Sequence, residues 1–221
     1  AQRLRERGLG VLLFDLRGHG HSGEGKLSGG LFEQQDLLGA FDWLVEQGVP
    51  PERIGVLGFS LGGAVALLAA AQEPRLRAVA TDSAFADLRD LVADEVPKRT
   101  SAPEWLVPAL VPGMVAAARL AYGIDLGAIV PEEAVARLDY PLLLMHSRAD
   151  TRIPAEHALR LKAAARHPAT ELWLVDGVEH ARLFKGYADE YVERVAAYFQ
   201  ARFQAARPTA LEDARRLALA P

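Results

Sequence analysis

The residue with the clearest chemical signature is Ser60, at the centre of a G-x-S-x-G motif in residues 58–62. An apolar run, residues 54–57, precedes the motif, and a run of small and apolar residues, 61–71, follows it. This order predicts a tight turn from a strand into a helix. We expect side chains at positions 58 and 62 to collide in such a strained turn, which explains glycine at both. Ser60 would then project as a nucleophile, with the N–H of Leu61 aimed at a developing oxyanion.

A serine hydroxyl becomes an effective nucleophile only when a base takes its proton and an acid orients that base. Candidates for both follow later apolar runs: Asp150 lies beyond residues 142–145, and His180 lies beyond residues 171–175. The carboxyl ends of parallel strands meet at one edge of a sheet. We therefore expect Asp150 and His180 to lie at the same edge as Ser60.

Asp82 supports a competing interpretation. It ends a predicted strand about 20 residues after Gly62, where a dinucleotide-binding fold places a ribose-binding acid. That fold needs glycine at the position of Ser60, because the pyrophosphate approaches the backbone there, so the interpretation is disfavoured. Asp82 and Asp176 also stand as reserve candidates for the acid beside Asp150.

The remaining histidines favour structural roles. His157 and His167 fall on the surface and at the end of a predicted helix, where we expect them to be solvated, and His146 is expected to pack at a strand end. His19-x-His21 resembles a metal-binding pair, but no acidic cluster accompanies it. We predict no metal site there.

Composition limits the class of protein. The 221 residues are 50% hydrophobic, enough for one large α/β domain. The net charge is −4 with acids and bases interspersed, which argues against a nucleic-acid partner. There is no cysteine, and no apolar stretch approaches the roughly 20 residues of a membrane segment. We expect a cytoplasmic location, although a signal or anchor upstream would change it, and nothing in the sequence indicates an oligomeric state.

Predicted strands and helices alternate along most of the chain, the pattern of a parallel sheet covered by helices on both faces. The predicted strands are residues 11–15, 54–57, 78–81, 142–145 and 171–175. The predicted helices are residues 2–7, 31–47, 61–71, 155–165 and 187–203.

Residues 84–137 break this alternation, because prolines interrupt their apolar runs. We predict that they form a small helical cap over a core of residues 1–83 and 138–203, with residues 204–221 as a C-terminal tail. A cap packed on the core would show the same pattern as one that binds substrate. The cap residues that are candidates for an apolar acyl pocket are Trp105, Leu106, Leu110, Val111 and Met114.

With the motif around Ser60 followed in order by Asp150 and His180, the chain resembles the serine-hydrolase branch of the α/β-hydrolase superfamily over about residues 10–203. The loop Arg17-Gly18-His19-Gly20-x-Ser22 adds to the likeness. The resemblance implies a three-layer α/β/α sandwich with a mostly parallel sheet. It implies that Asp150 orients His180, and that His180 deprotonates Ser60 and later protonates the leaving group.

That family uses a second oxyanion N–H from the loop after its third strand. Its strand order, 1-2-4-3-5-6-7-8, would place the third strand between residues 11–15 and 54–57, and no such strand precedes residue 11. We therefore expect an N-terminally truncated part of a longer protein, an α/β-hydrolase fold lacking its first strands. We expect the 221-residue chain by itself to be poorly active, because one oxyanion donor is worth about 100- to 1000-fold in rate.

The leading functional hypothesis is hydrolysis of an ester, thioester or amide in a small-molecule acyl substrate, through an acyl-Ser60 intermediate and without a cofactor. The alternative from another class is a non-catalytic α/β module that keeps the motif. Acyl transfer to an acceptor other than water is a neighbouring possibility.

Overall fold

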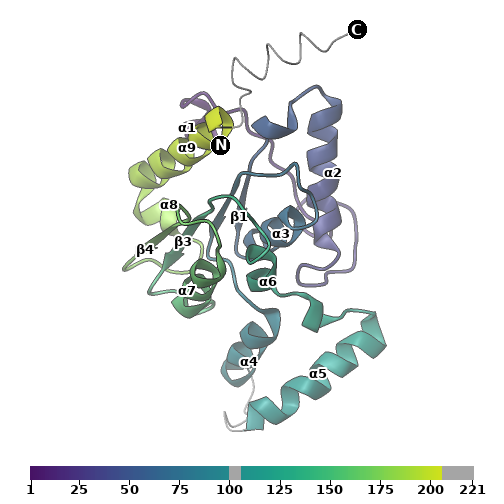
Figure 1. Cartoon of the computed structure of the whole chain (residues 1–221). Helices are drawn as coiled ribbons and strands as arrows, with labels where there is room; N and C mark the ends of the chain where they lie inside the picture. Colours follow the sequence, from purple (N-terminus) through teal and green to yellow (C-terminus); the bar gives the residue numbers. More distant parts are fainter. Residues whose placement is uncertain (100–105, 206–221) are drawn as a thin grey trace.

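A computed structural model describes residues 1–99 and 106–205. At its centre lies a parallel four-stranded sheet with the order β1-β2-β3-β4 (Figure 1). The strands are β1 (Val56–Phe59), β2 (Val79–Asp82), β3 (Leu143–Ser147) and β4 (Glu171–Val175). Because all four run in the same direction, their carboxyl ends share one edge of the sheet.

Helices cover both faces of the sheet, which gives three layers (Figure 1). One face packs against α2 (Glu33–Glu46), α3 (Leu61–Ala70), α6 (Pro131–Val135) and α7 (Ala155–Ala164). The other face packs against α1 (Gln2–Arg5), α8 (Leu183–Gly186) and α9 (Ala188–Ala205). The short 3-10 helix η1 (Pro51–Arg53) leads into β1. The expected α/β/α sandwich is confirmed.

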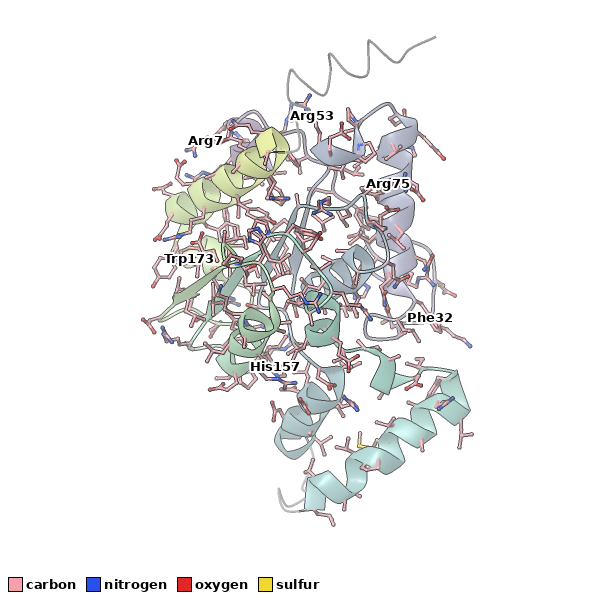
Figure 2. All side chains as sticks on the ribbon, viewed as in Figure 1. Arg7, Phe32, Arg53, Arg75, His157 and Trp173 are labelled. Carbon is pink, nitrogen blue, oxygen red and sulfur yellow. The ribbon has the colours of Figure 1, made fainter. Side chains whose placement is uncertain are left out.

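Two helices show how the sequence produces this packing. Most of α3 is buried because it consists of small and aliphatic residues, which allow close approach to the sheet. The last long helix, α9, buries one stripe at helical spacing and leaves its opposite face polar. The buried residues of that stripe are Tyr191, Val192, Val195, Ala196 and Phe199. Figure 2 shows Trp173 of β4 on this side, where its ring contacts Tyr187 and Tyr191.

The last four predicted strands are confirmed to within about two residues at each end, but the prediction for residues 11–15 is wrong. Residues 9–16 have no regular structure, and the apolar side chains of Leu12, Leu13 and Phe14 are exposed. Among the described residues, no strand lies beyond β1 on that side of the sheet. An apolar run cannot form a strand without a neighbour that satisfies its N–H and C=O groups.

The region between β2 and β3 holds α4 (Leu88–Arg99), α5 (Val107–Tyr122), η3 (Leu126–Ala128) and α6. In Figure 1, α4 and α5 project away from the sheet, whereas α6 lies against α3. Of the described residues, no single helix is long and apolar enough to cross a membrane. One bent pair, Ala109–Tyr122 with Leu126–Val135, meets the length and composition criteria. The residues of α6 in that pair are largely buried in protein.

Candidate active site

Ser60 lies at a sharp turn between β1 and α3, as its motif predicts. Its backbone has φ 51° and ψ −119°, a region that non-glycine residues rarely occupy. Glycine is required at position 58, because a Cβ there would lie 2.2 Å from the carbonyl oxygen of Gly62. The expected collision at position 62 itself is wrong, since a Cβ on Gly62 would meet nothing within 4 Å. The second tight position is Gly63, where a Cβ would come within 3.0 Å of Ala84.

The structure brings Ser60, His180 and Asp150 into one hydrogen-bonded chain. The Ser60 Oγ lies 2.8 Å from His180 Nε2, and His180 Nδ1 lies 2.7 Å from Asp150 Oδ2. Since an ionised carboxylate only accepts, Nδ1 carries the proton toward Asp150 and Nε2 is left to accept the Ser60 hydroxyl proton. Three loops at the carboxyl ends of β1, β3 and β4 position these side chains.

Asp150 is held in its ionised form. Burial acts to raise the pKa of this carboxyl, but hydrogen bonds from His180 and the Ile153 amide outweigh it, and the net pKa is below the usual value. Its Oδ1 accepts the backbone N–H groups of Arg152 and Ile153 at 3.0 and 2.9 Å. The loop after β3 therefore fixes the Asp150 carboxylate, and the fixed carboxylate orients His180.

His146 packs beneath this acid. It is fully buried, and its Nε2 donates to the Ile153 carbonyl oxygen at 2.8 Å. Burial lowers the pKa of its imidazole, so the ring is neutral. The structural role predicted for His146 is confirmed.

Leu61, the predicted oxyanion donor, is the first residue of α3. The amides of a helix's first turn have no intrahelical acceptor, so this N–H is available at the base of the Ser60 side chain.

A cavity of about 180 Å³ opens beside the nucleophile. Its wall is mainly apolar, with one charged residue of each sign. The lining residues are Ser60, Leu61, Phe85, Leu88, Leu91, Glu95, Arg152, Ile153 and His180. The loop after β2 and α4 supply four of these nine residues, and the loops of the three hydrogen-bonded side chains and the start of α3 supply the others.

The predicted substrate contacts are not brought to this cavity. Leu106, Leu110 and Met114 lie at or after the start of α5 and do not line it, and the last two are about 40% exposed. Trp105 lies outside the described residues. The substrate-binding role of these residues therefore stays a prediction. Leu88 and Leu91, which the sequence prediction did not name, carry one local signal, because they are spaced to share one face of a helix.

Asp176 and His157 lie in environments that differ from each other. Asp176, a reserve candidate for the acid, is exposed and lies 3.5 Å from Arg148. His157 was expected to be solvated, and this is wrong. Its side chain is buried between α7 and α4, where Nδ1 accepts the Ala86 N–H (Figure 2). The wrong assumption was that α7 faces solvent at this position, whereas α4 covers it.

Candidate metal ligands do not cluster in the described part of the chain. No group of three or more His, Asp or Glu side chains there is arranged to hold a metal ion. His19 and His21 are exposed, and His19 Nδ1 contacts the Arg17 carbonyl oxygen instead.

Comparisons with known proteins identify the family and fold of the chain. The uncharacterized protein YfhR of Salmonella typhi is 27% identical over 210 residues, covering 89% of this chain and 64% of its own length. YqkD of Bacillus subtilis, also uncharacterized, is 28% identical over 193 residues and is covered over 62% of its length. The chain therefore spans slightly less than two thirds of these curated relatives.

Among solved structures, the esterase Pf2001 of Pyrococcus furiosus superposes with a TM-score of 0.72 at 26% identity. The match covers 91% of this chain and 74% of the esterase. A monoacylglycerol lipase from Paleococcus ferrophilus shares the fold, with a TM-score of 0.66 at 19% identity, 91% of this chain and 87% of the lipase being covered. The model of the prolyl oligopeptidase family (Peptidase_S9) matches residues 1–206. The chain therefore belongs to the prolyl oligopeptidase family and has an α/β-hydrolase fold.

Proposed function

We propose that this chain carries the catalytic centre of a serine hydrolase that cleaves an ester, thioester or amide through an acyl-Ser60 intermediate. The observation that carries the proposal is the chain of hydrogen bonds from Ser60 through His180 to Asp150, with distances of 2.8 and 2.7 Å. These three groups supply the nucleophile, the general base and the orienting acid that acyl transfer needs.

In the first half-reaction, Ser60 Oγ attacks the acyl carbon while His180 Nε2 takes its proton. The carbonyl electron pair moves to the oxygen, and the Leu61 N–H donates to that oxyanion. Asp150 stabilises the imidazolium without taking its proton. The electron pair then returns, the bond to the leaving group breaks, and His180 gives the leaving group its proton.

In the second half-reaction, His180 removes a proton from water as the water oxygen attacks the acyl carbon. Collapse of the second oxyanion breaks the bond to Ser60 Oγ, which regains a proton from His180. The products are a carboxylic acid, released after the alcohol, thiol or amine. An acceptor other than water at this step would make the same centre an acyltransferase.

The shape of the cavity supports a small acyl group. About 180 Å³ accommodates a short chain or a single side chain, and the apolar residues Phe85, Leu88 and Leu91 favour a hydrophobic one. The fold relation to the esterase Pf2001 supports ester substrates, and membership in the prolyl oligopeptidase family supports amide substrates, with an amine as the leaving group, as the alternative.

The test begins with a probe that does not depend on the substrate. A fluorophosphonate should form a covalent adduct with Ser60 of the purified chain, detected by intact mass and located by peptide mapping. Ser60→Ala should abolish the adduct, and Ser22→Ala, which changes an exposed serine in the loop before α2, should leave it intact. A series of chromogenic esters and aminoacyl anilides would then identify the leaving group. Persistent labelling or turnover in Ser60→Ala would overturn the proposal, and the absence of any adduct on the unmodified chain would favour the non-catalytic alternative.

A further inference from the structure

Three non-glycine residues in the described part of the chain have a left-handed backbone: Ser60, Ser83 and Ala181, with φ of 51°, 59° and 53°. Such residues cost of order 1 kcal/mol or more each and persist only where surrounding contacts impose the conformation. They do not scatter over the surface. Ser60 is the nucleophile, Ala181 follows the base His180, and Ser83 follows the end of β2, between the strands that carry the other two.

Hydrogen bonds from a single dipeptide, Asp82-Ser83, connect these positions. The Ser60 N–H donates to the Asp82 carbonyl oxygen at 2.8 Å, which fixes the start of the turn that carries the nucleophile. The Ala181 N–H donates to Ser83 Oγ at 3.1 Å, which fixes the residue after His180. The Ser83 N–H in turn donates to the Met145 carbonyl oxygen at 2.9 Å, which anchors the dipeptide to β3.

The Asp82 carboxylate sets the direction of the Ser83 hydroxyl. Ser83 Oγ donates its one proton to Asp82 Oδ1 at 3.0 Å, so its lone pairs are left to accept the Ala181 N–H. Both Asp82 and Ser83 are completely buried, so water does not compete for these bonds. A hydroxyl without the Asp82 acceptor would rotate. The Ser83 hydroxyl is instead held with its oxygen facing the loop that carries His180 and Ala181.

Burying the Asp82 carboxyl in this position costs folding free energy. Its buried Oδ2 faces the buried Tyr191 hydroxyl of α9, a donor that interacts with this carboxyl. Burial raises the pKa of Asp82 to about 6, a rise that the hydrogen bonds from Ser83 and Tyr191 and the nearby His180 oppose and the charge of Asp150 assists. An apolar residue in place of Asp82 would make the fold more stable, so packing does not explain why a carboxyl lies at this position.

We propose that Asp82 and Ser83 form a positioning unit that holds the loop of the nucleophile and the loop of the base in register, so that Ser60 and His180 meet at hydrogen-bond distance. Neither residue reacts with substrate; both act through Ser60 and His180. The inference rests on the proposed function, because it assigns a role in the same reaction.

The variant that isolates this role is Ser83→Gly. Glycine adopts φ 59° without strain, so the substitution removes the hydroxyl and not the backbone conformation. We expect the melting temperature to fall by only a few degrees, because relief of the backbone strain offsets part of the lost hydrogen bonding. The kcat should fall about tenfold and KM should be unchanged, because the alignment of the reacting groups is lost. The rate of fluorophosphonate labelling should fall in parallel. Ser22→Gly, at an exposed serine, is the matched control and should change none of these quantities.

A second variant separates geometry from charge. Asp82→Asn keeps an oxygen that accepts the Ser83 hydroxyl and removes only the charge, so we expect kcat to fall less than threefold. An unchanged kcat and labelling rate in Ser83→Gly would overturn the inference, as would an Asp82→Asn loss equal to that of Ser83→Gly. These outcomes are distinct from failure of the proposed function, which would appear as activity retained in Ser60→Ala.

Discussion

The loops at the carboxyl ends of the strands and the α4–α5 region are held in place by different means. In the strand-end loops, buried main-chain and side-chain hydrogen bonds fix each reacting group, as at Asp150, whose carboxylate accepts two backbone amides. By contrast, α4 is tied to the rest of the protein by the apolar packing of Leu88 and Leu91 and by side-chain ion pairs. Arg160 of α7 donates to Asp90 at 2.6 Å, and His157 lies 3.8 Å from Asp94.

This difference assigns separate tasks to the two regions. The strand-end loops contain the groups that make and break bonds, whereas α4 supplies Leu88 and Leu91 to the cavity wall. Changes in the first region should therefore lower kcat, and changes in the second should alter KM and the choice of substrate. The following variants test that division.

The largest effect is expected for Asp150→Asn. An amide in place of the buried carboxylate cannot stabilise the imidazolium and favours the wrong tautomer of His180, so kcat should fall about 1000- to 10,000-fold. Steady-state kinetics on the best chromogenic ester would measure the loss. Asp176→Asn, at an exposed acid, is the control. Comparable losses in both variants would show that Asp150 has no special role.

A smaller effect, and one of a different kind, is expected for Leu91→Trp. The larger side chain fills part of the cavity, so KM should rise roughly tenfold for longer acyl chains while kcat for the shortest ester is preserved. The matched control is Leu110→Trp on α5, a position that does not line the cavity. If Leu110→Trp changes chain-length preference and Leu91→Trp does not, the cavity has been assigned to the wrong helix.

Asp82 gives a prediction about stability and pH. Its pKa rises from 3.8 in the unfolded chain to about 6 in the fold. The folded state therefore binds the proton more tightly, and the associated stability is present below pH 3.8 and lost as pH rises through 6. Between pH 5 and pH 7 the free energy of unfolding should fall by about 1 kcal/mol more in the unmodified protein than in Asp82→Asn. Urea unfolding at the two pH values measures this. Parallel changes in both proteins would contradict the assignment.

The smallest effect is expected for Arg160→Ala. Its ion pairs with Asp90 and Glu132 are partly exposed, so their loss should cost less than about 1 kcal/mol and lower the melting temperature by only a few degrees. Because α4 loses a contact with α7, KM should rise about two- to threefold. Arg194→Ala, which breaks one ion pair from α9 to Glu171 of β4 and one to Glu190 within α9, should leave KM unchanged. Equal KM changes in the two variants would contradict the prediction that the contact between α7 and α4 affects substrate binding in the cavity.

The sequence by itself determined the parts of this protein that depend on local pattern. The motif around Ser60 predicted the strained turn, and the apolar runs before Asp150 and His180 predicted two of the strands. Parallel strands bring their carboxyl ends together, so chain order was enough to place the three side chains at one edge. The hydrogen bonds among them then agree with the expectation drawn from the sequence.

Only the tertiary structure decided what depends on contacts between segments distant in the chain. An apolar run at residues 11–15 looks like a strand, yet a strand exists only with a hydrogen-bonding neighbour, and none of the described strands pairs with it. His157 looks like a surface residue until α4 is placed over it. The joining of the nucleophile and base loops through Ser83 has no local signal, because a serine after a strand is usually a turn residue. Its role follows from Ala181, 98 positions away in the sequence, donating to its side chain in the fold.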